Sequence, residues 1–256
     1  MRTLCVARGV GTEFRYKLIA DALRERVAAG EFPGGGLLPS ESELSSAYEA
    51  SRVTVRKALE ALRDDGLVDS RQGFGWFVAV DPLRQTLGRL GTLEQQLAES
   101  GVQPERKVLE FGFVRATKRV ATVWGAARVL EVRRLNLADG SPFARVTVWV
   151  PEDLAGDLSR SVVERSSFYD NLPVKVGGAT QTIGAALVSD VDAVLLHIPV
   201  GSPVLCCHRV THDVDGRAVL FSEFVFPAHR TEFVVELPHA EASIAPNGLR
   251  LLGPGV

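Results

Sequence analysis

The chain has 256 residues, of which 46% are hydrophobic and 23% charged, and its formal net charge at pH 7 is −2. This balance is typical of a soluble globular protein, and the near-neutral charge argues against a protein that coats DNA without sequence preference. Three cysteines, Cys5 and the adjacent Cys206 and Cys207, cannot form a disulfide framework. No apolar run is long enough for a signal-peptide core or a membrane span. We expect a cytoplasmic protein with no membrane partner.

Two helices are predicted near the start of the chain. Residues 1–12 carry no periodic pattern, but from residue 14 to residue 27 apolar side chains recur at spacings of three and four, which is typical of an amphipathic helix. The glycine-rich stretch 33–36 ends it. Ser40, with Glu43 three residues later, has the pattern of a capping box and predicts a short helix over 41–48.

A third helix and a hairpin follow. Ser51 is a good N-cap for a helix that continues to Asp64, before Gly66 stops it. Residues 67–70 and 76–80 are predicted strands, and the glycine-bearing turn between them favours a β-hairpin. These elements together predict a small α-rich head.

The rest of the chain has a different pattern. Residues 81–88 are interpreted as a linker, residues 89–240 as an α+β body, and residues 241–256, rich in Ala, Pro and Gly, as a loose tail. The predicted helices of the body cover 92–100, 167–172 and 190–196. Its predicted strands cover 107–116, 128–138, 144–150, 203–213, 218–227 and 231–237.

The helix over 51–64 concentrates the residues suited to DNA. On a helical wheel Val55, Leu59 and Leu62 form one narrow apolar stripe that must face the core. Arg52 and Arg56 lie one turn apart on the flank of that stripe. Residues 51–57 include three cations and no acid, so the N-terminal half of the helix presents positive charge to an anion. Arginine can pair with guanine in the major groove.

Three further residues of this helix, Val53, Thr54 and Lys57, are expected to project away from the stripe, into solvent or a partner. Ordinary amphipathic helices also look like this one. The capped helix before it and the hairpin after it are what favour DNA recognition. At the hairpin tip, Gly73 would let the backbone approach a phosphate.

The order and spacing of these segments resemble the GntR family of winged helix-turn-helix regulators over roughly residues 14–80. The motifs are Leu38-Pro39-Ser40-Glu41-Ser42-Glu43-Leu44, Ser51-Arg52-Val53-Thr54-Val55-Arg56-Lys57-Ala58-Leu59, Gly66-Leu67-Val68 and Arg71-Gln72-Gly73-Phe74-Gly75-Trp76-Phe77-Val78. The resemblance implies a winged helix-turn-helix over residues 12–80 in a homodimer that binds palindromic double-stranded operator DNA.

The resemblance also implies which residues contact DNA. They are Ser40, Ser51, Arg52, Val53, Thr54, Arg56, Lys57, Arg71, Gln72 and Gly73. Two positions depart from the family: Ser42 stands where Arg is common, and Val53 where Thr is frequent. We therefore expect an operator that differs from the usual half-site of the family.

Residues 89–238 resemble the UTRA effector-binding domain of the HutC subfamily, an α+β fold with an antiparallel sheet similar to chorismate lyase. The resemblance lies in the order of short segments, namely 135–142, 150–151, 166–172, 199–205 and 209–216, followed by Glu223 and Arg230. It implies a pocket for a small-molecule effector, expected to be an anionic metabolite, that modulates operator binding.

Members of this subfamily that bind sugar phosphates use two arginines at alternate strand positions, a serine at a helix start, and carboxylates. Arg134 matches the first arginine, whereas Asn136 stands at the second; strand alternation places both on one face and Arg133 on the other. Ser167 matches the serine. The expected effector-binding residues are Thr92, Arg134, Asn136, Ser167, Tyr169, Glu223 and Phe226.

Two other matches make the expected pocket less charged and more apolar than that of the sugar-phosphate binders, because Val146 replaces one carboxylate and Phe226 a tyrosine. Two alternatives stay open at this point. Arg134 could be a surface cation paired with Glu131 or with a neighbour, and Tyr169 could be a core residue.

The five histidines show no metal spacing, and His208 and His212 would share a strand face without a third ligand. No nucleotide-binding glycine pattern or serine-hydrolase motif is present, so we expect no catalytic residues, no metal and no cofactor. The leading hypothesis is an effector-controlled regulator, most simply a repressor. The alternatives are an enzyme built on the lyase-like body and a non-specific DNA-packaging protein.

Overall fold

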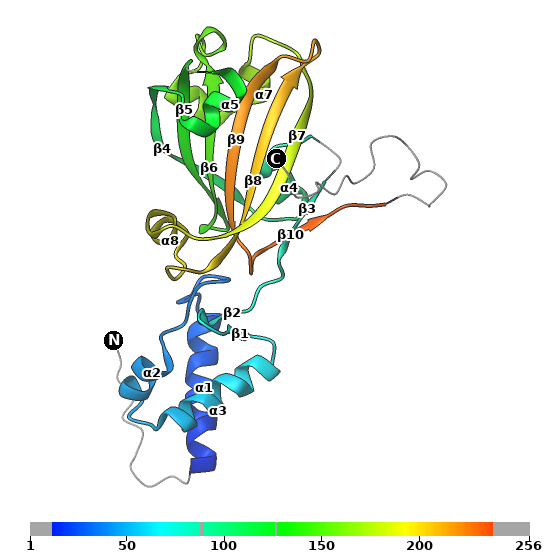
Figure 1. Ribbon diagram of the computed structural model, residues 1–256. Helices are drawn as coiled ribbons and strands as arrows, with labels where there is room; N and C mark the ends of the chain where they lie inside the picture. The colour runs from blue at the N-terminus through cyan, green and yellow to red at the C-terminus, as the bar shows by residue number, and fades with distance from the viewer. Residues whose placement is uncertain (1–11, 88–89, 126, 238–256) are drawn as a thin grey trace.

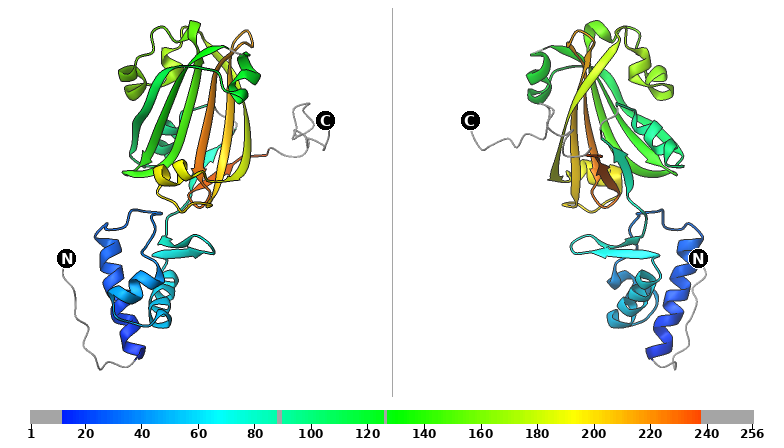
Figure 2. Two further views of the ribbon diagram at one scale, coloured as in Figure 1. Left: turned by 60° about the vertical axis from the view of Figure 1, so that its left-hand side comes forward. Right: turned by 90° about the vertical axis from the view of Figure 1, so that its right-hand side faces the viewer.

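The computed structural model describes residues 12–87, 90–125 and 127–237. The head and the body are stacked end to end, and the β-hairpin of the head lies between them (Figures 1 and 2). The elements of the head are α1 (Thr12–Ala28), α2 (Glu41–Ala47), α3 (Arg52–Asp64), β1 (Val68–Arg71) and β2 (Gly75–Val78). No helix among the described residues is long and apolar enough to cross a membrane.

The body continues from the second strand of the hairpin. Its elements are β3 (Leu83–Thr86), α4 (Leu93–Glu99), β4 (Pro104–Arg115), α5 (Lys118–Trp124), β5 (Arg128–Ala138), β6 (Ser141–Pro151), the 3-10 helix η1 (Glu152–Leu154), α6 (Arg160–Arg165), α7 (Phe168–Asn171), β7 (Val176–Leu187), α8 (Asp190–Leu196), β8 (Pro203–Asp213), β9 (Ala218–Pro227) and β10 (Thr231–Val234). The predictions for residues 1–11 and for the tail lie outside the described residues.

The apolar stripe of α3 forms the centre of the head. Val55, Leu59 and Leu62 are fully buried and pack with Leu23 of α1 and Leu44 of α2. Burial of each such side chain contributes about 1.5–3 kcal/mol, which is enough to hold three short helices together. The stripe predicted from the helical wheel is therefore confirmed.

Both predicted caps are present. Ser40 Oγ accepts a hydrogen bond from the Glu43 amide at 3.2 Å, and a Glu43 carboxylate oxygen accepts one from the Ser40 amide at 2.8 Å. Ser51 Oγ accepts one from the Thr54 amide at 3.2 Å. The Thr54 hydroxyl also bonds to Ser51 Oγ, and Thr54 is buried. The expectation that Thr54 projects into solvent was wrong, because its hydroxyl completes the cap.

The predicted linker contains a strand. β3 pairs in parallel with β10 from the far end of the body, with Leu83 opposite Thr231 and Thr86 opposite Val234. The chain therefore leaves the head and immediately joins a two-stranded ribbon of the body. This strand was not predicted, since four residues paired with a partner almost 150 positions away carry no local signal.

The body is one six-stranded antiparallel sheet in the order β4-β5-β6-β9-β8-β7. We call its two sides the inner and outer faces. The inner face carries Leu130, Val132 and Val148 and packs against α4, α6 and α7. The outer face carries Val129 and Trp149 and is partly covered by α5 and α8. Figure 2 shows the twisted sheet with short helices on both sides.

The head and the body meet through an aromatic cluster. Phe74 at the hairpin tip and Phe77 in β2 are both buried, and their rings lie 4.5 and 5.1 Å from the ring of His229 in the turn before β10. The same cluster includes Ala193 and Leu196 of α8. The hairpin is thus packed into the body on one side, and its position depends on α8.

Candidate DNA-binding surface and effector pocket

The first candidate surface lies on the head. The predicted DNA-binding residues other than Thr54 are exposed: Ser40, Ser51, Arg52, Val53, Arg56, Lys57, Arg71, Gln72 and Gly73. The C-terminal side of this surface is a groove between α2, α3 and the hairpin, lined among others by Arg56, Arg63 and Arg71. The helix and the wing tip therefore face a common groove.

Each cation of α3 has its own partner within the head. Arg52 donates to the hydroxyl of Ser42 at 3.0 Å. Arg56 donates twice to the carboxylate of Glu41. Lys57 lies 5.7 Å from the ring centre of Tyr16. Ser42, which replaces the arginine common in the family, thus serves as an acceptor for a neighbouring arginine.

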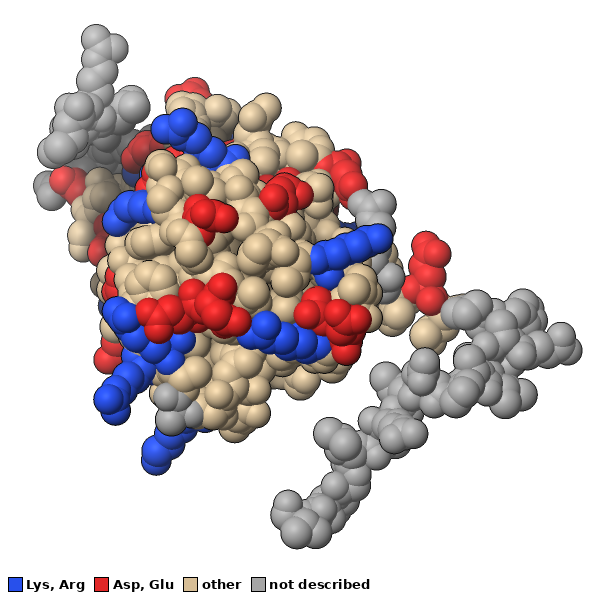
Figure 3. All heavy atoms as spheres, turned by 90° about the horizontal axis from the view of Figure 1, so that it is seen from above, with Lys and Arg blue, Asp and Glu red and all other residues tan. Residues whose placement is uncertain are grey.

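At the opposite end of the molecule, the described residues present a mixed charge distribution. Seen from the end of the body, Lys and Arg side chains are interspersed with Asp and Glu side chains, and neither the positive nor the negative residues form a continuous patch (Figure 3). Such a mixed surface attracts polyanions weakly. The side of α3 is the better candidate for contact with DNA.

The second candidate site is a pocket on the inner face of the body sheet. Four of the predicted effector residues, Thr92, Arg134, Ser167 and Tyr169, line it together. They come from the start of α4, from β5 and from the start of α7. The cavity measures about 30 Å³, which is room for little more than one water molecule. A metabolite can enter only if α4 and α7 move away from the sheet.

Arg134 is buried beneath this pocket. Its Nε and Nη1 atoms have no hydrogen-bond partner, and the nearest carboxylate oxygen, on Glu94, is 3.9 Å from Nη1. Burial lowers the pKa of Arg134 to about 10. A surface role with Glu131 is therefore wrong, since Glu131 lies on the other face and accepts a hydrogen bond from Trp149.

Two arginines that were not predicted complete the pocket. Arg106 of β4 donates to Glu94 at 2.9 Å and to the backbone oxygens of Val163 and Ser166. Arg209 of β8 bonds to the Tyr169 hydroxyl at 3.2 Å. Both arginines line the cavity.

The pocket is consequently more cationic than expected. Three guanidiniums, those of Arg106, Arg134 and Arg209, surround it, and Glu94 is close to two of them. Burial opposes ionisation of Glu94, but Arg134 and Arg106 still bring its pKa down to about 2. Glu94 can neutralise only one of the three charges, which favours an anionic occupant.

Three predicted effector residues do not line the pocket. Asn136 is fully buried and donates a hydrogen bond to Glu94 Oε1 at 2.6 Å, so it holds the Glu94 carboxylate in place and does not line the cavity. Phe226 lies deeper on the inner face, beside a separate small cavity. Glu223 points from the outer face, because strand alternation turns its neighbours Ser222 and Phe224 toward the pocket.

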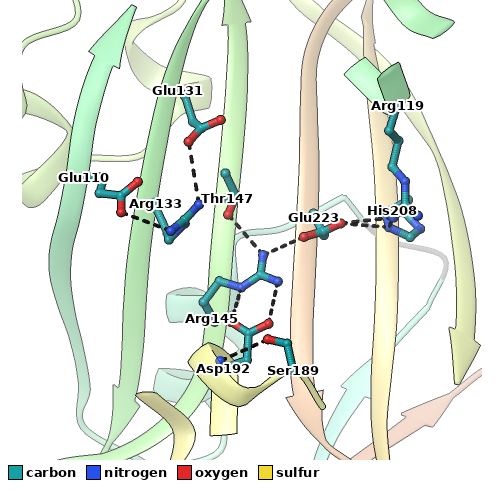
Figure 4. A network of polar contacts seen from close by, with 10 residues as sticks. All are labelled: Glu110, Arg119, Glu131, Arg133, Arg145, Thr147, Ser189, Asp192, His208 and Glu223. Carbon is teal, nitrogen blue, oxygen red and sulfur yellow. Dashed lines mark hydrogen bonds and ion pairs between the residues drawn. The ribbon is translucent and has the colours of Figure 1, made fainter. Parts of the chain in front are cut away.

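Glu223 belongs instead to a polar network on the outer face (Figure 4). Arg145 donates to Glu223 Oε1 at 2.6 Å and to the two carboxylate oxygens of Asp192 at 2.8 and 3.0 Å. Glu223 also bonds to His208 at 3.2 Å. Because Asp192 is on α8, this buried arginine ties α8 to the sheet.

The structure brings together no metal centre within the described ranges. No three His, Cys, Asp or Glu side chains there are close enough to hold an ion. Cys207 is buried, and burial raises the pKa of its thiol to about 12, so this cysteine is a poor nucleophile.

Comparison with known proteins assigns both parts of the chain to known domains. Residues 15–78 match the gntR family of bacterial regulatory proteins, and residues 99–232 match the UTRA domain. A transcriptional regulator of Mycobacterium tuberculosis is 34% identical over 228 residues, which cover 86% of this chain and 84% of that protein. The chain belongs to the GntR family.

Two further relatives match this GntR-family chain over most of its length. The transcriptional repressor NagR of Bacillus subtilis is 28% identical over 86% of this chain and 93% of its own length. The crystal structure of PhnF from Mycobacterium smegmatis matches with a TM-score of 0.58 and 26% identity, covering 87% of this chain and 99% of PhnF. The winged head and the UTRA body predicted from sequence are confirmed, and the chain is a DNA-binding regulator whose UTRA domain takes an effector.

Proposed function

We propose that this GntR-family regulator is a homodimeric repressor whose affinity for a palindromic operator is controlled by a small anionic metabolite bound in the pocket above Arg134. The observation that carries the proposal is the buried guanidinium of Arg134 with two unpartnered nitrogens. The charge of Arg134 is only partly compensated, because Glu94 lies 3.9 Å away and also pairs with Arg106. A bound anion would lower the cost of burying it.

A phosphate or carboxylate group fits the chemistry of this pocket. Arg134 would supply N–H donors from its guanidinium, Arg209 and the Tyr169 hydroxyl a second point of contact, and the Ser167 hydroxyl a third. The phenyl rings of Phe168 and Phe224 lie beside Arg134 and Arg209 at 5.5 and 5.1 Å and give the rest of the ligand an apolar wall.

The structural change caused by effector binding would be transmitted to the head through the polypeptide chain. Arg209 donates to the backbone oxygen of Gly91, next to the Thr92 cap of α4. Moving α4 outward pulls on the segment that leads back through β3 to the hairpin. Because Phe74 and Phe77 are packed into the body, the wing cannot follow without repacking.

A second connection runs through the sheet. Ser222 and Phe224 line the pocket on one face of β9, and Glu223 between them holds Arg145 on the other. Arg145 in turn holds Asp192 of α8, which packs against the wing. A shift of β9 on ligand binding would therefore move α8, on which the hairpin packs. Allosteric coupling requires an element of this kind, whose position both sites can change.

The homodimer is supported by the unequal edges of the sheet. The β4 edge carries a proline and five charged residues, which discourage further pairing. The twelve residues of β7 include no charge and no proline. Beside the end of β7 lies an exposed apolar patch, Leu187, Val191, Val194 and Val200. A second copy can pair with this edge across a two-fold axis, since antiparallel pairing of identical strands is self-complementary.

We also propose that the protein represses transcription and that it does not catalyse a reaction. NagR, which matches over most of both chains, is named a repressor. Glu94, with its pKa near 2, is too weak a base for proton transfer near neutral pH, so we propose that the body binds its ligand without converting it. A cytoplasmic location follows from an operator target.

The direct test is to capture fragments of the organism's own genome with the purified full-length protein at low salt and to sequence them. We expect a small set of fragments that share a palindrome, with protection from nuclease over that palindrome. Capture of all fragments in proportion to their length, or of none with and without a metabolite extract, contradicts the proposal.

A further inference from the structure

Glu41, the first residue of α2, connects the three parts of the head that face the groove. Its Oε1 accepts hydrogen bonds from Arg56 Nε of α3 at 2.9 Å and from Trp76 Nε1 of β2 at 3.2 Å. Its Oε2 accepts one from Arg56 Nη2 at 2.7 Å. The Glu41 side chain is 20% exposed, whereas that of Arg56 is 61% exposed. The carboxylate is therefore sheltered behind the guanidinium, and the hydrogen bonds from Arg56 keep its pKa below the usual value.

This geometry leaves one edge of Arg56 available. A guanidinium has five N–H groups in a rigid plane, and Glu41 occupies the edge formed by Nε and Nη2. The edge formed by Nη1 and the second hydrogen of Nη2 has no partner in the described part of the chain. That edge has the spacing to donate to O6 and N7 of a guanine. Since the other edge is fixed to α2, the free edge has a set direction.

The same contact changes what Arg56 can do electrostatically. Paired with Glu41, it adds no net charge to the groove, and the carboxylate behind it disfavours a phosphate. Arg52 differs, because its hydrogen-bond partner Ser42 is neutral, so that no ion pair occupies its guanidinium. Within one helix turn the head therefore has an arginine suited to phosphate and an arginine suited to a base edge.

We infer that Glu41 is a specificity-determining positioning residue for operator recognition. It directs the free edge of Arg56 toward a base pair and prevents Arg56 from serving as a general phosphate contact. The inference rests on the proposed function, since it requires that α3 face DNA.

The experiment uses the full-length protein and a pool of duplex DNA with a randomised central segment. Bound duplexes are sequenced to obtain the preference at each position, and affinity for an unselected duplex is measured against salt. Glu41→Gln retains an acceptor for Trp76 but loses the charge and the second strong acceptor for Arg56. We expect this variant to lose about tenfold of its preference at one base pair per half-site, which is the lower end of what a bidentate arginine contributes.

The variant should also bind unselected DNA more tightly. Released from Glu41, Arg56 can contact one phosphate, which steepens the slope of log affinity against log salt by about 0.9. Glu43→Gln is the matched control. It removes the same charge from the same groove, it retains a capping-box residue, and Glu43 makes no contact with Arg56. We expect it to leave the base preferences unchanged.

Arg56→Ala identifies the base pair concerned and should abolish the preference at that position. In its background, adding Glu41→Gln should cause no further loss there. Equal effects of the Glu41 and Glu43 variants, or an unchanged preference in Arg56→Ala, overturn the inference while leaving the proposed function intact. If Glu41→Gln does not fold, Glu41→Asp, which shortens the reach of the carboxylate to Arg56, takes its place in the same comparison with Glu43→Gln. A wild-type protein that selects no sequence removes the proposed function and this inference together.

Discussion

Replacing Arg134 by Met should make the protein more stable and unable to respond to anions. Methionine fills much of the same volume without a charge, so the buried site loses its unpartnered nitrogens. This change stabilises the ligand-free protein, whereas it removes the main hydrogen-bond donor for the ligand. Replacing a residue that has a structural role would destabilise the protein. Greater stability together with a lost response to anions therefore distinguishes a ligand-binding residue from a packing residue.

The size of the gain follows from the pKa of Arg134. Burial lowers that pKa from 12.5 to about 10. At about 1.4 kcal/mol per tenfold change in acidity, this amounts to a cost of about 3 kcal/mol for holding the charge in the folded protein at pH 7. The figure already includes the attraction of Glu94 at 3.9 Å. Since Met does not fit the site ideally, we expect a gain of about 1–3 kcal/mol in the free energy of unfolding.

The assay is urea unfolding of wild type and variant, with and without inorganic phosphate, a sugar phosphate or a dicarboxylate. A ligand that binds the wild type at a hundred times its Kd adds about 2.7 kcal/mol, and Arg134→Met should show none of this. Arg133→Met is the control, because Arg133 lies on the outer face, 33% exposed and paired with Glu110. It should change stability by less than about 0.5 kcal/mol and keep the ligand response. A destabilised Arg134→Met would refute the reasoning and make Arg134 a structural partner of Glu94.

Three other predictions concern the head and its junction with the body. In a fluorescence anisotropy titration, Arg52→Ala should weaken binding to operator and to unselected DNA by similar factors and lower the slope of log affinity against log salt by about 1, and an unchanged slope removes Arg52 from the DNA surface. Phe74→Ala should cost about 3 kcal/mol and separate the unfolding of head and body into two calorimetric transitions, whereas one transition at the wild-type temperature would show that Phe74 does not join them. His229 should make stability depend on pH: burial lowers its pKa from 6.5 to about 4, so the unfolded chain binds a proton that the folded chain rejects. Stability should therefore fall by up to about 3 kcal/mol as the pH drops from 6.5 to about 4, and equal losses in wild type and His229→Phe would contradict this.

Elements with strong local signals were predicted well from sequence. The capping box at Ser40 and the apolar stripe of α3 defined the head, and the predicted limits of β5 and α8 agree with the structure. In each case local chemistry and tertiary packing favour the same conformation.

The missed elements lack such signals. β7 has the sequence VGGATQTIGAAL, whose glycines and alanines show no alternation, and it is a strand because β8 pairs with it along its length. The short helices α5 and α6 are one or two turns long and owe their stability to single anchors in the core, Val120 and Val163.

The effector pocket was predicted only in part, because its residues converge from distant strands. Arg134 and Ser167 were recognisable by position, but Arg106 and Arg209 have no local feature that distinguishes them from surface arginines. Glu223 was assigned by position in the family pattern. Strand alternation measured from Arg209 on β8, through its pairing with Ser222, could have placed Glu223 on the outer face.

An anion in the pocket above Arg134 is proposed to control how tightly the head binds DNA. The most direct measurement is the operator affinity of the full-length protein, titrated against the anionic metabolite that most stabilises it, in parallel for wild type and Arg134→Met. The operator affinity of the wild type should change by roughly five- to 150-fold, which is the usual range of allosteric coupling. The operator affinity of the variant should stay the same throughout the titration. A wild-type affinity that is indifferent to every stabilising anion, or a variant that responds as the wild type does, would contradict this proposal.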